Sequence, residues 1–211
     1  MRFRNRSEAG HLLAGTLDRY KGQNDLLVLA LPRGGVPVAY EVAKALNAPL
    51  DVFIVRKLGV PGHEELAMGA IASGGVRALN RSVIEQLNIS QSAIDAAATR
   101  EGEELQRRER LYRGGKPSPD IAGRTVILVD DGLATGATTK AAVAALRQQN
   151  PAKIVVAVPL APADTCDELQ RLADEVVCAV TPELFWAVGQ WYEDFDQTTD
   201  AEVTELIRHA A

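Results

Sequence analysis

The chain has 211 residues, of which 46% are hydrophobic, and a formal net charge of −5. This length predicts a single domain with its own core. The acidic balance disfavours a protein whose surface as a whole binds nucleic acid, because such surfaces are usually basic. No apolar run approaches the roughly 20 residues of a membrane-spanning helix, and no apolar stretch follows the basic N-terminus as it would in a secretory signal. We therefore expect a cytoplasmic protein with neither a membrane nor a nucleic acid as partner.

The elements predicted along the chain alternate between strands and helices. A lead-in helix over residues 7–20 comes first. Because the apolar runs that follow are nearly continuous, each should form a strand covered on both faces, which is typical of a parallel sheet. The predicted fold is therefore α/β, with an open, mainly parallel sheet flanked by helices. The predicted strands are 26–31, 50–55, 125–129, 153–158 and 175–180, and the helices between them are 36–46, 138–149 and 163–173.

Two segments stand outside this alternation. Residues 82–113 are charged and helical in pattern, and we interpret them as an insertion that projects from the sheet. Residues 182–199 hold both tryptophans, which indicates a cap over part of the molecule. We predict one domain over residues 1–211, with a core from residue 24 to about 180 and a small hood formed by the N-terminal helix and residues 181–211.

The two cysteines, Cys166 and Cys178, have neither the spacing of a metal site nor that of a disulfide framework. Both lie in apolar surroundings, where a free cysteine packs as a small hydrophobic residue. The prediction is two separate core thiols in a reducing compartment.

Two predicted strand ends lead into unusual loops. In open α/β sheets, ligands bind at the carboxyl ends of the strands. The sequence PRGGVP follows the first strand, and DDGLATGATT follows the third. Glycines let backbone amides turn inward, and the start of the next helix offers unpaired N–H groups. Thr135, Thr138 and Thr139 add hydroxyl groups, so the second loop is suited to hold a phosphate, although it lacks the lysine of a Walker loop.

Asp130 and Asp131 would repel a phosphate unless they faced another part of the ligand. Carboxylates accept hydrogen bonds from ribose hydroxyls and also bind Mg²⁺. A ribose 5-phosphate satisfies both halves of the segment, with its hydroxyls on the carboxylates and its phosphate on the loop.

At this point the chain resembles the type I phosphoribosyltransferases. Their fingerprint is two acidic residues after an aliphatic strand, three variable positions, and then Thr-Gly-x-Thr, which residues 130–138 match position for position. LPRGG resembles the pyrophosphate loop of the family, and VRKLG resembles a third element that follows the next strand. The wider set, with PGHEELAMGAIASGG, is similar to a subgroup of phosphoribosyltransferases whose acceptor is not known.

The resemblance implies 5-phosphoribosyl 1-diphosphate as donor, a small nitrogenous base as acceptor, Mg²⁺ as cofactor, a homodimer, and a place in nucleotide salvage. Asp130, Asp131, Arg33 and Lys57 would be catalytic, and the two aspartates would bind the metal weakly, mostly through the ligand or water. The implied substrate-binding positions are Arg33, Gly34, Gly35, Arg56, Lys57, Asp130, Asp131, Ala134, Thr135, Gly136, Ala137 and Thr138, to which we add Trp191.

The acceptor side of the site is less defined. The 6-oxopurine enzymes of the family carry an Asp just before Thr-Gly, whereas this chain has Ala134, as in the adenine- and uracil-type enzymes. Residues 58–77 are the candidate for the flexible loop that closes over the reaction. Within it, His63, Glu64 and Glu65 are either a source of a general base or a surface turn. Trp191 is our choice for stacking the base, with Trp186, Tyr192 and Phe195 as alternatives.

An alternative function is a non-catalytic protein that binds the donor and regulates transcription. Such sensors often lose the basic pair or the flexible loop, and this sequence has candidates for both. No helix-turn-helix segment is apparent, so the sequence favours the enzyme.

Overall fold

The computed structural model describes residues 2–210. A five-stranded sheet forms its centre, and every neighbouring pair of strands is parallel. The prediction of an open parallel sheet is therefore confirmed. In spatial order the strands are β2 (Leu50–Val52), β1 (Leu26–Ala30), β6 (Thr125–Val129), β7 (Lys153–Leu160) and β8 (Glu175–Val180).

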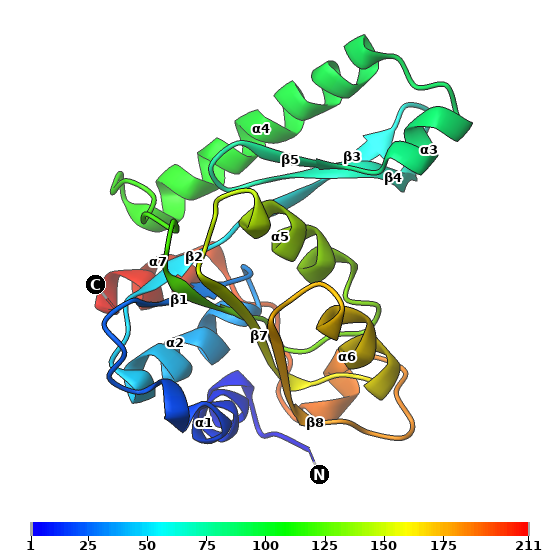
Figure 1. Cartoon of the computed structure of the whole chain (residues 1–211). Coiled ribbons are helices and arrows are strands. Elements are labelled where there is room, and N and C mark those ends of the chain that lie inside the picture. Colours follow the sequence, from blue (N-terminus) through cyan, green and yellow to red (C-terminus); the bar gives the residue numbers. More distant parts are fainter. Residues whose placement is uncertain (1, 211) are drawn as a thin grey trace.

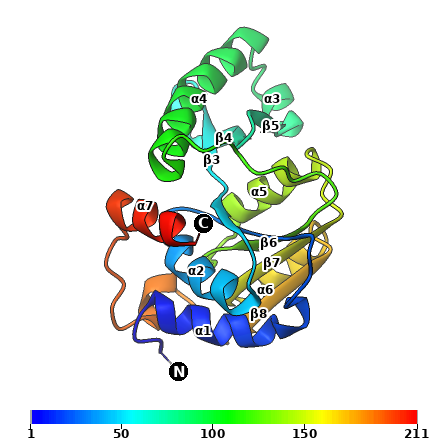
Figure 2. The ribbon, with the colours of Figure 1, turned by 90° about the vertical axis from the view of Figure 1, so that its left-hand side faces the viewer.

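Helices cover both faces of this sheet (Figures 1 and 2). They are α1 (Arg6–Thr16), α2 (Gly35–Leu46), α5 (Ala137–Arg147), α6 (Ala163–Gln170) and α7 (Asp200–His209), and a 3₁₀ turn, η1 (Asp18–Tyr20), follows α1. Successive side chains of a strand point to opposite faces. Accordingly Ile127 and Val129 of β6 pack with α1, α2 and α7, whereas Val126 and Leu128 pack with α5 and α6. This two-sided burial explains the unbroken apolar runs of the sequence.

A second, smaller lobe stands over α5, on one face of the sheet (Figures 1 and 2). Its elements are β3 (Val55–Val60), β4 (His63–Ala72), β5 (Val76–Leu79), α3 (Arg81–Gln86) and α4 (Gln91–Arg113). The three strands form an antiparallel sheet, and α4 packs against β3 and β4. Helix α5 lies between this sheet and the central one.

The lobe corrects two predictions. The run 50–55 is not one strand, because the chain leaves the central sheet after Val52, and the Ile54 N–H donates to Ser73 Oγ (2.9 Å). Residues 58–77, expected to be a flexible loop, lie mostly in β3, β4 and β5. Their glycines suggested a loop, but Gly69 instead lets two strands approach, since a Cβ there would lie 2.6 Å from Ala78 O. The lobe therefore begins before the predicted insertion 82–113 and adds a sheet to its helices.

Arg113, at the end of α4, ties the lobe to the central sheet. Its Nε donates to both carboxylate oxygens of Asp51 in β2 (3.1 and 3.0 Å), and both residues are buried. Burial raises the pKa of Asp51, and the guanidinium of Arg113 opposes that shift. The buried guanidinium and the buried carboxylate therefore neutralise each other.

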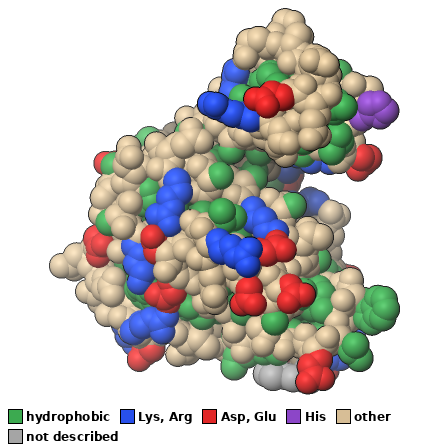
Figure 3. Space-filling view, turned by 45° about the vertical axis from the view of Figure 1, so that its right-hand side comes forward, with side chains coloured by type: hydrophobic (Ala, Val, Ile, Leu, Met, Phe, Trp, Pro, Cys, Tyr) green, Lys and Arg blue, Asp and Glu red, His purple; other side chains and the backbone are tan. Residues whose placement is uncertain are grey.

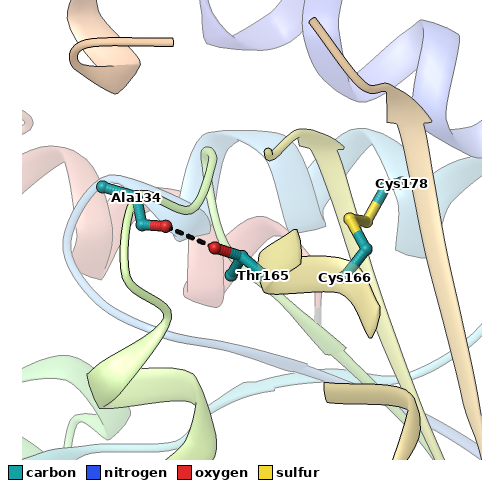
Figure 4. Close-up of a disulfide and its surroundings, with 4 residues drawn as sticks. All are labelled: Ala134, Thr165, Cys166 and Cys178. Carbon is teal, nitrogen blue, oxygen red and sulfur yellow. Dashed lines mark hydrogen bonds between the residues drawn. A yellow bond between two sulfur atoms is a disulfide. The ribbon is translucent and has the colours of Figure 1, made fainter. Parts of the chain in front are cut away.

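The prediction of two separate cysteine thiols is wrong, since Cys166 of α6 and Cys178 of β8 form a disulfide (Figure 4). Their separation of twelve residues fits no familiar framework, and only the packing of α6 on β8 brings them together. Among residues 2–210, no helix combines the length and apolar character needed to cross a membrane.

Candidate active site

The two unusual loops meet because β1 and β6 are neighbours in register. Ala30 pairs with Val129, so both strands end at the same level, and the Leu31 N–H donates to Val129 O (2.9 Å). Gly35 begins α2 directly against this edge, where a Cβ would lie 2.8 Å from Val129 O and 3.0 Å from Asp130 Cα. A Cβ on Gly34 would collide with the Asp131 carboxylate. The glycines of the PRGG segment are therefore required by close packing.

Asp130 and Asp131 lie partly buried at the end of β6. The Asp131 N–H donates to Asp130 Oδ1 (2.9 Å). Burial, and next the charge of Asp131, raise the pKa of Asp130 well above the ordinary value of an aspartate. Burial also raises the pKa of Asp131, although Arg6 opposes this shift. Two adjacent carboxyl groups of this kind favour a bound cation or hydroxyl donors that would stabilise their charge.

Arg6 is the functional candidate that sequence reasoning missed. Its Nε donates to Asp131 Oδ2 (2.8 Å), and its Nη1 donates to Asp196 O (2.7 Å). Its guanidinium carbon also lies 4.1 Å from the centroid of the Phe195 ring. Arg6 is 125 residues from Asp131 in sequence, and no local pattern around it indicates this contact. Only the docking of α1 beside the strand end creates it.

The aromatic segment lies against the carboxylate loop. The Tyr192 hydroxyl donates to Asp131 O (2.6 Å), and the Tyr192 ring stacks on Phe195 at 5.0 Å. Burial raises the pKa of the Tyr192 phenol, so the group remains a donor. Trp191 packs with the hydrophobic cluster around Phe3, whereas Trp186 is 83% exposed. Tyr192 and Phe195 are thus the aromatic residues tied most directly to the carboxylates, and the choice of Trp191 for the base stays a prediction.

The predicted phosphate loop opens helix α5. Ala134, Thr135, Ala137 and Thr138 are exposed, and Gly136 adopts φ +65°, a left-handed conformation that glycine tolerates best. The first N–H groups of any α-helix have no partner within the helix, and their dipoles favour an anion. The loop can therefore accept a phosphate group.

The basic residues predicted for the diphosphate lie in different places. Arg33 of the PRGG turn has about one-third of its side chain exposed, and its Nη1 lies 3.8 Å from Asp200 Oδ1. Lys57 lines a cavity of about 600 Å³ together with Ala137 and Thr138 of the phosphate loop. Figure 3 shows the hollow between the lobe and the body of the molecule. Arg56 is on the opposite face of β3, where Nε and Nη2 donate to Glu101 Oε2 of α4 (3.0 and 2.7 Å).

The suggested general bases belong to the lobe. His63, Glu64 and Glu65 are exposed at the start of β4, and the Glu65 carbonyl accepts a hydrogen bond from Lys57 Nζ (3.0 Å). Their role stays a prediction.

A magnesium ion would need help from the ligand to bind here. Within residues 2–210, no three His, Cys, Asp or Glu side chains gather in a group able to hold a metal. The two carboxylates do suit Mg²⁺, which commonly binds through one or two carboxylates plus substrate oxygens. The residues present therefore fit a metal that arrives with a phosphorylated ligand.

The fold and the site define a class of protein. A parallel sheet carries a carboxylate pair, a Thr-Gly loop that opens helix α5, and a glycine-rich loop, all at adjacent carboxyl ends of its strands. Open α/β proteins of this class bind their ligands at this edge of the sheet.

Residues 5–196 match the phosphoribosyl transferase domain, and the chain belongs to that family. It is 49% identical over 208 residues to a protein of Mycobacterium tuberculosis named "Putative phosphoribosyl transferase", a match that covers 99% of this chain and 47% of that protein. The chain thus spans about half the length of the curated relatives it matches.

Two solved structures show the same fold. The protein TT1426 from Thermus thermophilus is 43% identical, with a TM-score of 0.88 over 100% of both chains. The purine phosphoribosyltransferase from Pyrococcus horikoshii is 16% identical, with a TM-score of 0.50 over 92% of both chains. The resemblance read from the motifs is therefore confirmed at the level of family and fold.

Proposed function

We propose that the protein transfers the phosphoribosyl group of 5-phosphoribosyl 1-diphosphate to a nitrogen atom of a small base and releases diphosphate. The observation that carries this proposal is the meeting of the β1 and β6 loops at one strand edge. The two loops pack so closely there that a Cβ on Gly35 would lie 3.0 Å from Asp130 Cα. A ligand that spans both loops must carry a group for carboxylates and a group for backbone amides.

Each part of the donor has a suitable partner. We assign its 5-phosphate to residues 134–138 at the start of α5 and its ribose hydroxyls to Asp130 and Asp131. The diphosphate is assigned to Arg33 and the backbone amide of Gly34, beside Gly35, whose own N–H donates to Leu31 O (3.1 Å). Lys57 faces the cavity beside the phosphate loop, and we assign it to the diphosphate as well. Arg56 is engaged by Glu101, and we assign it to holding α4 on β3.

The reaction breaks the bond between C1 of the ribose and the diphosphate oxygen, which keeps the electron pair. The lone pair of the acceptor nitrogen forms the new C1–N bond, and its proton passes to water or to a base. Positive charge develops on the sugar in the transition state, and the nearby Asp130 and Asp131 carboxylates stabilise it. Arg33 and Lys57 stabilise the negative charge that grows on the leaving diphosphate. Mg²⁺, held by donor oxygens and the carboxylates, would add Lewis-acid stabilisation of the same charge.

Ala134 restricts the acceptor. Its methyl group can neither donate nor accept a proton, and its carbonyl accepts a hydrogen bond from the Thr165 hydroxyl. We therefore propose a base that requires no carboxyl group at this position, as in the adenine- and uracil-type enzymes. Tyr192 and Phe195 close the carboxylate side of the site, and we place the acceptor beside the segment that contains them and Trp191.

A panel assay tests this function. The protein is incubated with donor, Mg²⁺ and each common nucleobase, and the release of diphosphate is measured. Release with one base identifies the acceptor. Donor binding without release from any acceptor would instead support the regulatory protein, and absence of donor binding would exclude both.

The Asp131→Asn variant tests the assignment of the carboxylates. We expect turnover to fall by about 10²-fold, because one charge that stabilises the transition state is lost. Asp25→Asn is a matched control, since Asp25 precedes β1 at the opposite end of the same sheet. Normal donor binding and turnover in Asp131→Asn would contradict the assignment.

A further inference from the structure

Thr165 contacts the phosphate loop with both halves of its side chain. Its hydroxyl donates to Ala134 O (2.7 Å), as Figure 4 shows. Its methyl carbon lies so close to Gly136 that a Cβ added to that glycine would be only 3.0 Å from it. Thr165 is only 7% exposed, so its side chain is fixed by its surroundings. It lies in the first turn of α6 and belongs to none of the sequence motifs.

The bond to Ala134 determines which way the loop amide points. In a trans peptide the C=O and the following N–H point to opposite sides. Because the Ala134 carbonyl points to Thr165, the Thr135 N–H points away from α6. Anion binding at this loop depends on the direction of such amides. Thr165 can therefore act on the ligand through the loop without touching it.

The disulfide fixes the position of Thr165. Cys166 is the next residue, and its bond to Cys178 joins the first turn of α6 to β8 (Figure 4). Helix α6 has only eight residues, and its N-cap residue, Pro162, makes no side-chain capping bond. A helix this short is marginal without tertiary contacts. The cross-link thus adds a covalent constraint to the packing that holds the turn carrying Thr165.

We propose that Thr165 is a positioning residue for the phosphate loop, and that the Cys166–Cys178 disulfide makes donor affinity depend on redox state. A dithiol reductant supplies two electrons and two protons. Its thiolate attacks one cysteine sulfur and displaces the other cysteine, which takes a proton. Its second thiol then displaces the first cysteine, and the reductant leaves as a disulfide. The freed first turn of α6 holds the Ala134 carbonyl less firmly.

The inference rests on the proposed function, and calorimetric titration with 5-phosphoribosyl 1-diphosphate and Mg²⁺ separates the two. We expect the oxidised protein to bind the donor about 3- to 10-fold more tightly than the protein reduced with dithiothreitol, the range expected for one hydrogen bond. Thiol labelling verifies each state. If neither state binds the donor, the proposed function fails; if both bind it equally, only the redox inference fails.

Variants at Thr165 isolate the positioning role. Thr165→Val keeps the shape but removes the hydroxyl, and we expect it to weaken donor binding about 3- to 10-fold and to reduce the redox difference. Thr165→Ser keeps the hydroxyl and should retain that difference. Thr99→Val is a matched control, because the Thr99 hydroxyl bonds only within α4, to Asp95 O. Thr165→Val with unchanged donor affinity would overturn the role of Thr165.

The variant with both Cys166→Ser and Cys178→Ser tests the disulfide itself. We expect it to bind the donor like the reduced protein and to be insensitive to dithiothreitol, with an unchanged circular dichroism spectrum. Affinity equal to that of the oxidised wild type would overturn the coupling.

Discussion

At the scale of single residues, Arg6 supplies the positive charge nearest to the carboxylate pair. It combines an ion pair with Asp131, a bond to a carbonyl and a contact with the Phe195 ring. Arg6 and Asp131 have only 12% and 14% of their side chains exposed. This contact is therefore less screened by water than the many ion pairs on the surface.

The Arg6→Gln variant should reduce the free energy of unfolding at neutral pH by about 1.5–3 kcal/mol, the range for a hydrogen bond to a charged group. Without the guanidinium, the pKa of Asp131 should rise further. The loss should therefore diminish at acidic pH, where the carboxyl group is protonated. Urea denaturation at several pH values measures this, with Arg4→Gln as control, since the Arg4 side chain is 75% exposed. A loss that does not change with pH would contradict the assignment.

The raised pKa of Asp130 predicts opposite pH trends for stability and donor binding. Above the ordinary aspartate value of 3.8, the unfolded chain releases a proton that the folded protein retains. The contribution of Asp130 to the free energy of unfolding therefore falls as the pH rises from 3.8 towards its raised pKa. Donor affinity should rise over the same window, because ionised carboxylates accept hydroxyl bonds and bind the metal. Calorimetry across this range tests the trend, and Asp130→Asn should flatten it; an equally steep trend in that variant would assign it to another group.

At the scale of elements, the start of α2 packs against the end of β6 with no space for a side chain. Gly35→Ala should destabilise the protein by about 1–3 kcal/mol through overpacking, because its Cβ would press on Val129 O and Asp130 Cα. Gly15→Ala in α1 is the matched control, since a Cβ there meets nothing within 4 Å. That control should instead stabilise the helix by about 1 kcal/mol. Thermal unfolding of both proteins measures the contrast, and similar midpoints would contradict it.

Strand alternation separates the roles of the two basic residues of β3. Lys57→Met should lower turnover by about 10²-fold while stability stays near that of the wild type. Arg56→Met should chiefly reduce stability, because Glu101 loses two hydrogen bonds and keeps only the more distant and exposed Arg100 as an ion-pair partner. Steady-state kinetics and urea denaturation of both variants test this division. If Arg56→Met lost more turnover than Lys57→Met, Arg56 would instead be assigned to binding the diphosphate.

At the scale of the whole molecule, the site depends on parts of the chain that are far apart. Phe3 forms a bridge to Tyr192, which brings the N-terminal and aromatic segments side by side. Tyr192 then reaches Asp131, and α1 delivers Arg6 to the same carboxylate. The lobe above the sheet contributes Lys57 and one wall of the cavity. Three chain regions thus surround the two loops that the motifs identify.

The amino-acid sequence alone is sufficient to predict the parallel sheet, the order of its strands and helices along the chain, and the two loops at the site. These features are local: unbroken apolar runs require two-sided burial, and the Asp-Asp and Thr-Gly-x-Thr segments identify the loop that follows β6, as PRGG identifies the one that follows β1. The ligands were inferred from the family resemblance, because hydrophobic periodicity carries no information about ligands.

Four features became visible only in the folded protein: the antiparallel sheet of the lobe, the Cys166–Cys178 disulfide, the pairing of Arg6 with Asp131 and the placement of Thr165. The physical reason is common to all four. Each depends on contacts between segments whose local pattern is ordinary, such as a glycine-rich stretch, a lone arginine or a threonine in a short helix. Such residues acquire their roles from the packing of elements that approach one another only when the chain is folded.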